Sequence, residues 1–425
     1  MKQLEFPYGK GKLTHTFKEH ELAGVLTSAI EEYVPDGTPE QLVEAALAHP
    51  IGSPPLRELA KGKRNVVIIA SDHTRPVPSK IIIPPMIREI RAAAPDAQIT
   101  LLIATGCHRG TTKAELADKF GADIVKHECI YVHDCDDRDK LVNIGTLPSG
   151  GECEINRLAI EADLLVAEGF IEPHFFAGYS GGRKSVLPGV AGRTTVLANH
   201  CAEFIAHECA RTGILTGNPI HEDMVWAAKT AKLAFIVNVV LNGEKRTIHA
   251  VAGHPEAAHT AGVEFLSSLC GTKAVPSDIV ITTNGGYPLD QNMYQAVKGM
   301  TAAEATVKQG GVIIMLAESG DGIGGDHFYH QLADEPDIQK TMAKFLARGR
   351  SKTVPDQWQT QILLRILTRA RVIYVSAMDD ETVRKMHMTP SHSLDEALTL
   401  ARAMVDTPAP SIVAIPDGVA VVVTT

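Results

Sequence analysis

Short apolar runs alternate with amphipathic stretches along most of the chain. The runs are rich in Val and Ile and are continuous, as is typical of strands that are covered on both faces of a parallel sheet. They span residues 65–70, 98–104, 162–167, 233–241, 278–283, 310–316 and 370–376. Residues 38–49, 112–120 and 255–269 have the periodicity of amphipathic helices. This alternation predicts an α/β protein with mostly parallel sheets.

The pattern breaks at residues 271–277, GTKAVPS, between a long predicted helix and the next strand. A length of 425 residues is also enough for more than one domain. We therefore predict two α/β domains, one over 1–272 and a smaller one over 277–405. The tail over 406–425 is expected to return as strands to one of them, and the pattern does not decide which.

Composition narrows the class of protein. With 44% hydrophobic and 21% charged residues, the chain can bury a large core and is not a disordered protein. Its net charge of −9 argues against binding to nucleic acid or to anionic membranes. The sequence contains no apolar run long enough to span a bilayer, and its seven cysteines form no C-x-x-C pair. We expect a cytoplasmic protein with reduced thiols.

Polar clusters follow directly after four of the predicted strands. They are SDHTRPVP (71–78), TGCHRG (105–110), EGFIEPHFFAGYSGGRKS (168–185) and NGGYPLDQ (284–291). Ligands bind beyond the carboxyl ends of strands in open α/β sheets, so we expect these loops to converge on one site. Three glycines within 178–185 leave backbone N–H groups open to a ligand phosphate.

The common cofactor motifs are incomplete. Residues 178–185 lack a phosphate-loop signature, because Arg183 occupies the position that requires glycine before the lysine. The G-x-G-x-x-G at 320–325 is not followed, about 20 residues later, by an acidic residue that ends a second strand. Two H-E dipeptides begin a zinc-protease pattern, but Tyr131 and Arg211 stand where its second histidine belongs. Nucleoside triphosphatases, nicotinamide-dependent enzymes and zinc proteases are therefore disfavoured.

Several long motifs nevertheless point to one family. SDHTRPVPS (71–79), ATGCHR (104–109), EGFIEPHFFAGYSGGRKSVLPG (168–189), ANH (198–200) and TNGGYPLDQNMYQAVKGMTAAEA (283–305) closely resemble the lactate racemase family of nickel-pincer 2-hydroxyacid racemases and epimerases. The likeness extends from PYGK (7–10) to IPDG (415–418). It implies an isomerase that interconverts D- and L-lactate by transient hydride transfer, with its active site in a cleft between two domains.

The resemblance also implies a cofactor and its partners. The family uses nickel(II) pyridinium-3,5-bisthiocarboxylic acid mononucleotide, the nickel-pincer nucleotide, which biosynthetic enzymes make and load. By resemblance Lys184 is joined covalently to this cofactor in the larger, N-terminal domain, and His200 is the protein ligand of Ni. Its sulfur and imidazole donors suit a late first-row metal. A homodimer is compatible with the sequence, which leaves the oligomeric state open.

The remaining roles that the resemblance implies concern the substrate and its protons. His108 and His174 are the implied acid/base pair. The implied cofactor contacts include Asp72, His73, Thr74 and Arg75, and the implied substrate contacts are Arg75, Gln295 and Lys298. Gln295 and Lys298 are three residues apart, so a helix would present both on one face.

Elementary chemistry agrees with two histidines. Proton removal from the α-carbon would place a second negative charge beside the carboxylate, whereas hydride loss leaves a neutral ketone. The hydroxyl must lose its proton as the hydride leaves, and each enantiomer places that hydroxyl differently. One base for each hand is therefore needed, and imidazole exchanges protons near neutral pH.

Other interpretations stay open at this point. The substrate could be another 2-hydroxy acid, either short and aliphatic or one such as malate, 2-hydroxyglutarate or a sugar acid. The same loops could belong to a non-catalytic protein that binds nucleotide-like anions. Trp358 either flanks the site or is an ordinary core aromatic. Arg183 is hypothesised to lower the pKa of Lys184 while the cofactor is attached.

Overall fold

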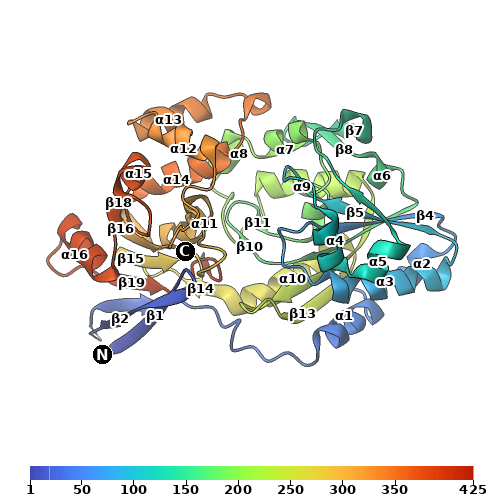
Figure 1. The fold of residues 1–425 in the computed structure, drawn as a ribbon, viewed down its shortest axis with the longest axis horizontal. Coiled ribbons are helices and arrows are strands. Elements are labelled where there is room, and N and C mark those ends of the chain that lie inside the picture. The colour runs from blue at the N-terminus through green and yellow to red at the C-terminus, as the bar shows by residue number, and fades with distance from the viewer. Residues whose placement is uncertain (19, 425) are drawn as a thin grey trace. The chain divides into compact units, whose positions relative to one another are not determined.

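The computed structural model describes residues 1–18 and 20–424, and the chain forms two compact units (Figure 1). The N-terminal unit contains 30–200 and 214–269. The C-terminal unit contains 1–29, 201–213 and the chain from Cys270 onward. The first 29 residues and 201–213 thus pack with the C-terminal unit, although both fall inside the range predicted for the N-terminal domain.

The N-terminal unit is built on a six-stranded sheet of order β13-β12-β9-β4-β5-β6. Its strands are β4 (Asn65–Ser71), β5 (Gln98–Ala104), β6 (Cys129–Val132), β9 (Leu164–Phe170), β12 (Leu233–Leu241) and β13 (Thr247–Gly253). Neighbouring strands are parallel except for β12 and β13. The strand predicted at 162–167 begins at Leu164 and continues to Phe170, so Glu168 lies within β9 rather than in the following loop.

Helices cover this sheet, and local sequence explains where several begin. They are α1 (Pro39–Ala48), α2 (Leu56–Ala60), α3 (Ser79–Ala93), α4 (Lys113–Phe120), α5 (Ala122–His127), α6 (Arg157–Ile160), α7 (Arg193–Asn199), α9 (Pro219–Thr230) and α10 (Pro255–Cys270). Thr38 and Thr112 cap α1 and α4 with reciprocal capping boxes. The core between helices and sheet is aliphatic, with Ile68, Leu101 and Val166 fully buried.

The C-terminal unit has its own parallel sheet, of order β18-β17-β16-β15-β19-β3. Its strands are β3 (Leu22–Val25), β15 (Ser277–Thr283), β16 (Val307–Leu316), β17 (Arg371–Val375), β18 (Thr389–Ser391) and β19 (Ile412–Ile415). Strand β19 lies between β15 and β3, and β20 (Val422–Thr424) pairs with β14 (Gly271–Lys273). The tail therefore returns to the C-terminal unit. Two α/β units with mostly parallel sheets confirm the predicted fold class.

An N-terminal hairpin completes the core of the C-terminal unit. Strands β1 (Lys2–Tyr8) and β2 (Gly11–Phe17) are antiparallel, and Phe6 and Phe17 are buried in one cluster with Ile281 and Ile314. The helices of this unit are α8 (Ala202–Ala206), α11 (Met293–Glu304), α12 (Asp326–Ala333), α13 (Ile338–Leu346), α14 (Gln357–Arg369), α15 (Asp380–Lys385) and α16 (Leu394–Met404). Within the described part of the chain, no helix has both the length and the apolar composition needed to cross a membrane.

Candidate active site

The predicted site residues of the N-terminal unit gather beyond three neighbouring strands. Strands β5, β4 and β9 are adjacent and parallel, so their carboxyl ends meet at one edge of the sheet. Asp72 follows β4 directly, and His108 lies four residues beyond the end of β5. The N–H of Gly106 donates to the carbonyl of Gly189, which ties the loop after β5 to the segment that contains Lys184.

Asp72 and His108 form a buried-carboxylate and exposed-imidazole pair. His108 Nδ1 lies 2.8 Å from Asp72 Oδ2, and the ring must donate here because a carboxylate only accepts. The Asp72 side chain is 1% exposed, whereas that of His108 is 46% exposed. The second oxygen, Oδ1, accepts from Thr74 Oγ1 at 2.6 Å and from Thr74 N at 3.1 Å. His108 is thus held through Nδ1 while Nε2 remains available as a proton acceptor.

The same contacts decide the charge of Asp72. Burial alone would raise the pKa of this carboxyl, but hydrogen bonds from His108 and Thr74 outweigh burial and hold its pKa below the usual value. Asp72 is therefore ionised at neutral pH. An ionised partner stabilises the imidazolium form of His108, which is the state that a base reaches after it accepts a proton.

His174 stands on a short hairpin that continues from β9. Strand β10 (Pro173–His174) pairs with β11 (Gly178–Tyr179), and the N–H of Ala177 donates to His174 Nδ1 at 3.2 Å. His174 contacts the ring of Phe176 edge-on, with centroids 4.5 Å apart. The two predicted acid/base histidines therefore come from different strands of one sheet edge and are oriented by different partners.

Phe176 also contacts the two residues predicted to hold the cofactor. The His200 ring lies 5.0 Å from the Phe176 centroid, and the Lys184 ammonium lies 6.0 Å from it. Lys184 belongs to the 3₁₀ turn η2 (Gly182–Ser185), and His200 caps the carboxyl end of α7. One aromatic ring thus contacts His174, Lys184 and His200, and no feature of the sequence distinguished Phe176 from its neighbours.

The state of His200 fits a metal ligand. Burial, reinforced by the positive charge of Lys184, lowers the pKa of His200 to about 3. The imidazole is therefore neutral at physiological pH, as a metal-binding nitrogen must be. A neutral buried imidazole beside a lysine is a donor set that suits a lysine-tethered cofactor with one protein ligand to its metal.

Arg183 is buried and hydrogen-bonded within the glycine-rich turn, which its position in the sequence did not indicate. Its buried guanidinium donates to the carbonyl of Ala177 at 2.8 Å and lies 3.0 Å from His259 Nε2. Burial lowers its pKa to about 9. Asn238 accepts from the N–H of Gly182, where φ is +53° and an added Cβ would meet His259 at 2.9 Å. These contacts fix the glycine-rich turn; the hypothesised effect of Arg183 on Lys184 stays a hypothesis.

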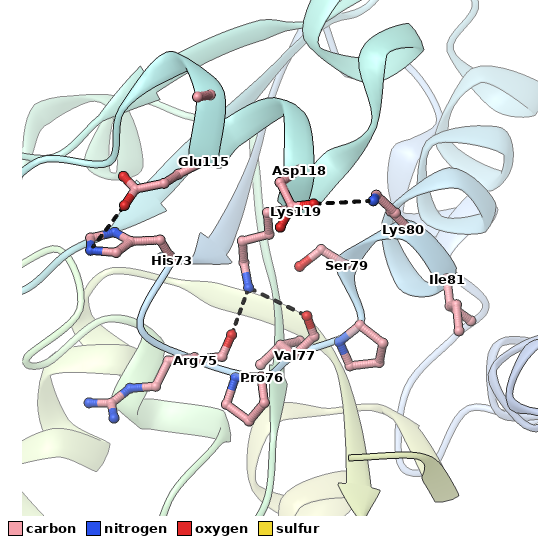
Figure 2. A pocket seen from close by; sticks show the side chains of 12 residues that line it. His73, Arg75, Pro76, Val77, Ser79, Lys80, Ile81, Glu115, Asp118 and Lys119 are labelled. Atoms are coloured by element: carbon pink, nitrogen blue, oxygen red, sulfur yellow. Dashed lines mark hydrogen bonds and ion pairs between the residues drawn. The ribbon is translucent and has the colours of Figure 1, made fainter. Parts of the chain in front are cut away.

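The remaining predicted residues occupy distinct places. His73 Nδ1 lies 3.1 Å from Thr111 Oγ1. Its Nε2 lies 3.9 Å from Glu115 Oε1, and Figure 2 shows this pair. Thr74 serves Asp72 as described, and Arg75 is exposed in the same loop. His73 is therefore engaged within the protein.

The predicted substrate residues Gln295 and Lys298 both lie on α11, in the C-terminal unit, and are half-buried. The helix predicted to carry them is present, and Asn292 caps its first turn by accepting from the N–H of Gln295. Trp358 lies in the first turn of α14 and hydrogen-bonds the side chain of Tyr294 on α11. Their meeting with His108 in a shared cleft stays a prediction.

Comparison with known proteins gives family matches in both units. Residues 8–213 match the family described as Lactate racemase N-terminal domain, and residues 272–423 match Lactate racemase C-terminal domain. The chain is 54% identical over 424 residues to lactate racemase of Thermoanaerobacterium thermosaccharolyticum, with 100% of this chain and 99% of that protein covered. It is 52% identical over 424 residues to lactate racemase of Lactiplantibacillus plantarum, with 100% of each covered.

Solved structures agree with these sequence matches. The lactate racemase apoprotein from T. thermosaccharolyticum superimposes with a TM-score of 0.96 at 53% identity, covering 100% of both chains. A protein from Thermotoga maritima reaches a TM-score of 0.63 at 17% identity, covering 92% of this chain and 100% of its own. The second likeness shows a shared fold alone.

Proposed function

This chain belongs to the lactate racemase family, and we propose that it is the isomerase that interconverts D- and L-lactate. The observation that carries the proposal is identity above 50% over the full length to two lactate racemases. The paired Asp72 and His108 and the grouping of His174, Lys184 and His200 around Phe176 give that identity a chemical basis.

The family uses a nickel-pincer cofactor, and two residues of this chain would hold it. Lys184 would provide the covalent attachment and His200 the protein nitrogen to Ni, since both lie against one aromatic ring and His200 is neutral. When bound, the cofactor supplies a reversible acceptor for hydride from the substrate α-carbon. The protein must then bind the substrate, exclude water and move the hydroxyl proton.

His108 and His174 would move that proton, one for each enantiomer. The Nδ1–H of His108 is committed to Asp72, so its Nε2 accepts the hydroxyl proton while the carboxylate stabilises the resulting imidazolium. His174 comes from the neighbouring hairpin and would serve the opposite hand, and the contact from the N–H of Ala177 to its Nδ1 must then give way so that Nδ1 carries a proton and Nε2 accepts one. For the substrate carboxylate, Arg75 offers a planar two-pronged donor, and Lys298 with Gln295 offers a point charge and an amide.

The cofactor proposal is tested on protein produced together with the cofactor-building enzymes. Intact-mass measurement is expected to reveal an adduct, and peptide mapping is expected to place it on Lys184. Protein made without those enzymes is the matched control and should have the unmodified mass. An adduct on a different residue, or lactate racemisation by the unmodified control, would contradict the assignment.

Isotope retention tests the hydride route. Lactate that carries deuterium on the α-carbon is expected to keep the label in the inverted product, because hydride does not exchange with water whereas an abstracted proton does. Chiral chromatography with mass detection measures the label in each enantiomer. Complete loss of deuterium to solvent with each inversion would require a carbanion mechanism instead.

Specificity among 2-hydroxy acids follows from the same proposal. We expect lactate to be racemised faster than malate, 2-hydroxyglutarate or sugar acids. The two relatives that match this chain over its full length are both lactate racemases. A panel of acids assayed on the loaded enzyme measures the preference.

A further inference from the structure

The loop of residues 71–79, here called the Asp72 loop, is anchored in the core at Val77, whereas Thr74 to Pro76 are exposed. It connects β4 to α3 and contains Asp72, Thr74 and Arg75, of which the last two are exposed. On one side it borders an open pocket of about 760 Å³, lined by residues of the loop, α3 and α4 (Figure 2). Val77 packs in the core five residues after Asp72, while the carboxylate of Asp72 itself is held by polar contacts.

Glu168 on β9 joins the two ends of the Asp72 loop. Its Oε1 accepts from the N–H of Ser71 at 3.2 Å, from Ser71 Oγ at 3.1 Å and from Ser79 Oγ at 2.7 Å. Ser71 is the last residue of β4 and Ser79 is the first of α3. Glu168 is 3% exposed, and its strand continues toward the hairpin that carries His174. One buried carboxylate therefore links the support of His108 to the strand that leads to His174.

Lys119 on α4 holds the middle of the same loop. Its ammonium donates to the carbonyl of Arg75 at 3.1 Å and to the carbonyl of Val77 at 3.4 Å (Figure 2). Burial lowers the pKa of Lys119, while the negative charges of Glu168 and Asp72 oppose that shift. Burial raises the pKa of Glu168, and the positive charge of Lys119 opposes that shift, so the ammonium interacts with both acidic groups while it binds the backbone of the loop.

We propose that Glu168 and Lys119 are positioning residues that hold the Asp72 loop in the geometry in which Asp72 orients His108. The inference rests on the proposed racemase function for its kinetic consequences, but the loop contacts themselves are independent of it. Neither residue needs to touch the substrate. Their effect on turnover passes through Asp72 and, through the backbone of the loop, through Arg75.

Lys119→Met tests the middle contact, because methionine keeps much of the side-chain volume and removes both donors. We expect kcat to fall about 10- to 100-fold, as small misplacements of catalytic groups do, with the adduct on Lys184 unchanged. Lys80→Met is the matched control: Lys80 lines the same pocket, but its exposed ammonium only approaches exposed Asp118 at 4.0 Å. We expect Lys80→Met to retain activity within about twofold.

Glu168 is tested by a graded pair of variants. Glu168→Gln keeps an oxygen that can accept from Ser71 and Ser79, whereas Glu168→Ala removes every acceptor. We expect the glutamine variant to keep most of the activity and the alanine variant to lose at least as much as Lys119→Met. Equal losses in both would show that the charge, not the anchoring hydrogen bonds, matters and would overturn the anchoring role.

Two readouts separate positioning from a general loss of stability. Hydrogen exchange of peptides covering 71–79, measured on the apoprotein, should speed up in Lys119→Met and Glu168→Ala and stay unchanged in Lys80→Met. In a double-mutant cycle, Lys119→Met should cost little further activity once Asp72→Asn is present, since both act through one pair. Additive losses with unchanged exchange in 71–79 would refute the proposal. An inactive wild type with accelerated loop exchange in the variants would instead refute only the racemase function.

Discussion

Replacing either His108 or His174 with alanine is expected to stop steady racemisation while the adduct on Lys184 stays in place. Each histidine is needed for one hand of the substrate, and a full turnover passes through both. General acid–base groups typically contribute about 10²- to 10⁴-fold, so we expect kcat to fall by at least that range in either variant. Activity is measured from each enantiomer by chiral chromatography, and the adduct by intact mass.

The symmetry of the reaction provides an internal control for these variants. The two enantiomers have equal free energies, so kcat/KM must be the same in both directions for every variant. A departure from equality would reveal an artefact of loading or assay. Two-way turnover near the wild-type rate in either alanine variant, with the adduct present, would contradict the two-base scheme.

Asp72→Asn is expected to lower kcat nearly as much as removal of a histidine, although it only replaces one carboxylate oxygen with an NH₂ group. Thr74 donates twice to Oδ1, so the amide oxygen of asparagine should remain there and its NH₂ should face His108 Nδ1. His108 would then carry its proton on Nε2, where the substrate proton should go. A comparable change of tautomer in a serine protease triad costs about 10⁴-fold in kcat, and we expect a loss of that order.

The tautomer itself can be measured without the cofactor. Nitrogen NMR of the apoprotein should find neutral His108 protonated on Nδ1 in the wild type and on Nε2 in Asp72→Asn. Thr74→Ala is the milder control, because it removes one of the two Thr74 donors and leaves the carboxylate facing the ring. If Asp72→Asn kept wild-type kcat, the pair would have no part in proton transfer.

The charge of Asp72 also sets a direction for pH effects. Its pKa is lower in the folded protein than in the unfolded chain, where an aspartate titrates near 3.9. Its contribution to folding stability is therefore fully present above that unfolded value and is lost as the pH falls through the lower folded pKa. Protonation of Asp72 should accordingly cause no loss of activity or stability at mildly acidic pH.

Much of the fold can be predicted from the sequence because buried parallel strands are continuous apolar runs. The runs at 65–70, 98–104 and 233–241 coincide with β4, β5 and β12 almost to the residue. The assignment of segments to the two units is harder to predict. Strand β3 and the segment 201–213 join the C-terminal unit through partners far away in sequence, and no local pattern encodes such pairing.

The candidate site was likewise predictable only in part. Motifs at strand ends contain His108, His174 and Lys184, because the carboxyl edge of a parallel sheet is where loops gather, whereas the roles predicted for them and for His200 come from the family resemblance. The contacts that orient them depend on which strands are neighbours, which the motifs do not state. Phe176 shows this limit: it lies in the recognised PHFFAG stretch, yet only the folded chain places three of the predicted residues around its ring.

The pairing of β3 with β19 has a consequence for how the protein is made. Leu22 pairs with Ile412, so β3 leaves the ribosome long before the strand that completes its pairing. Until then the apolar face that includes Phe6 and Phe17 lacks its partners on β15 and β16. Pairing between residues so far apart in sequence is slow and leaves aggregation-prone intermediates with exposed apolar surface. Nascent chains of this protein should therefore depend on chaperones more than chains whose domains are contiguous in sequence.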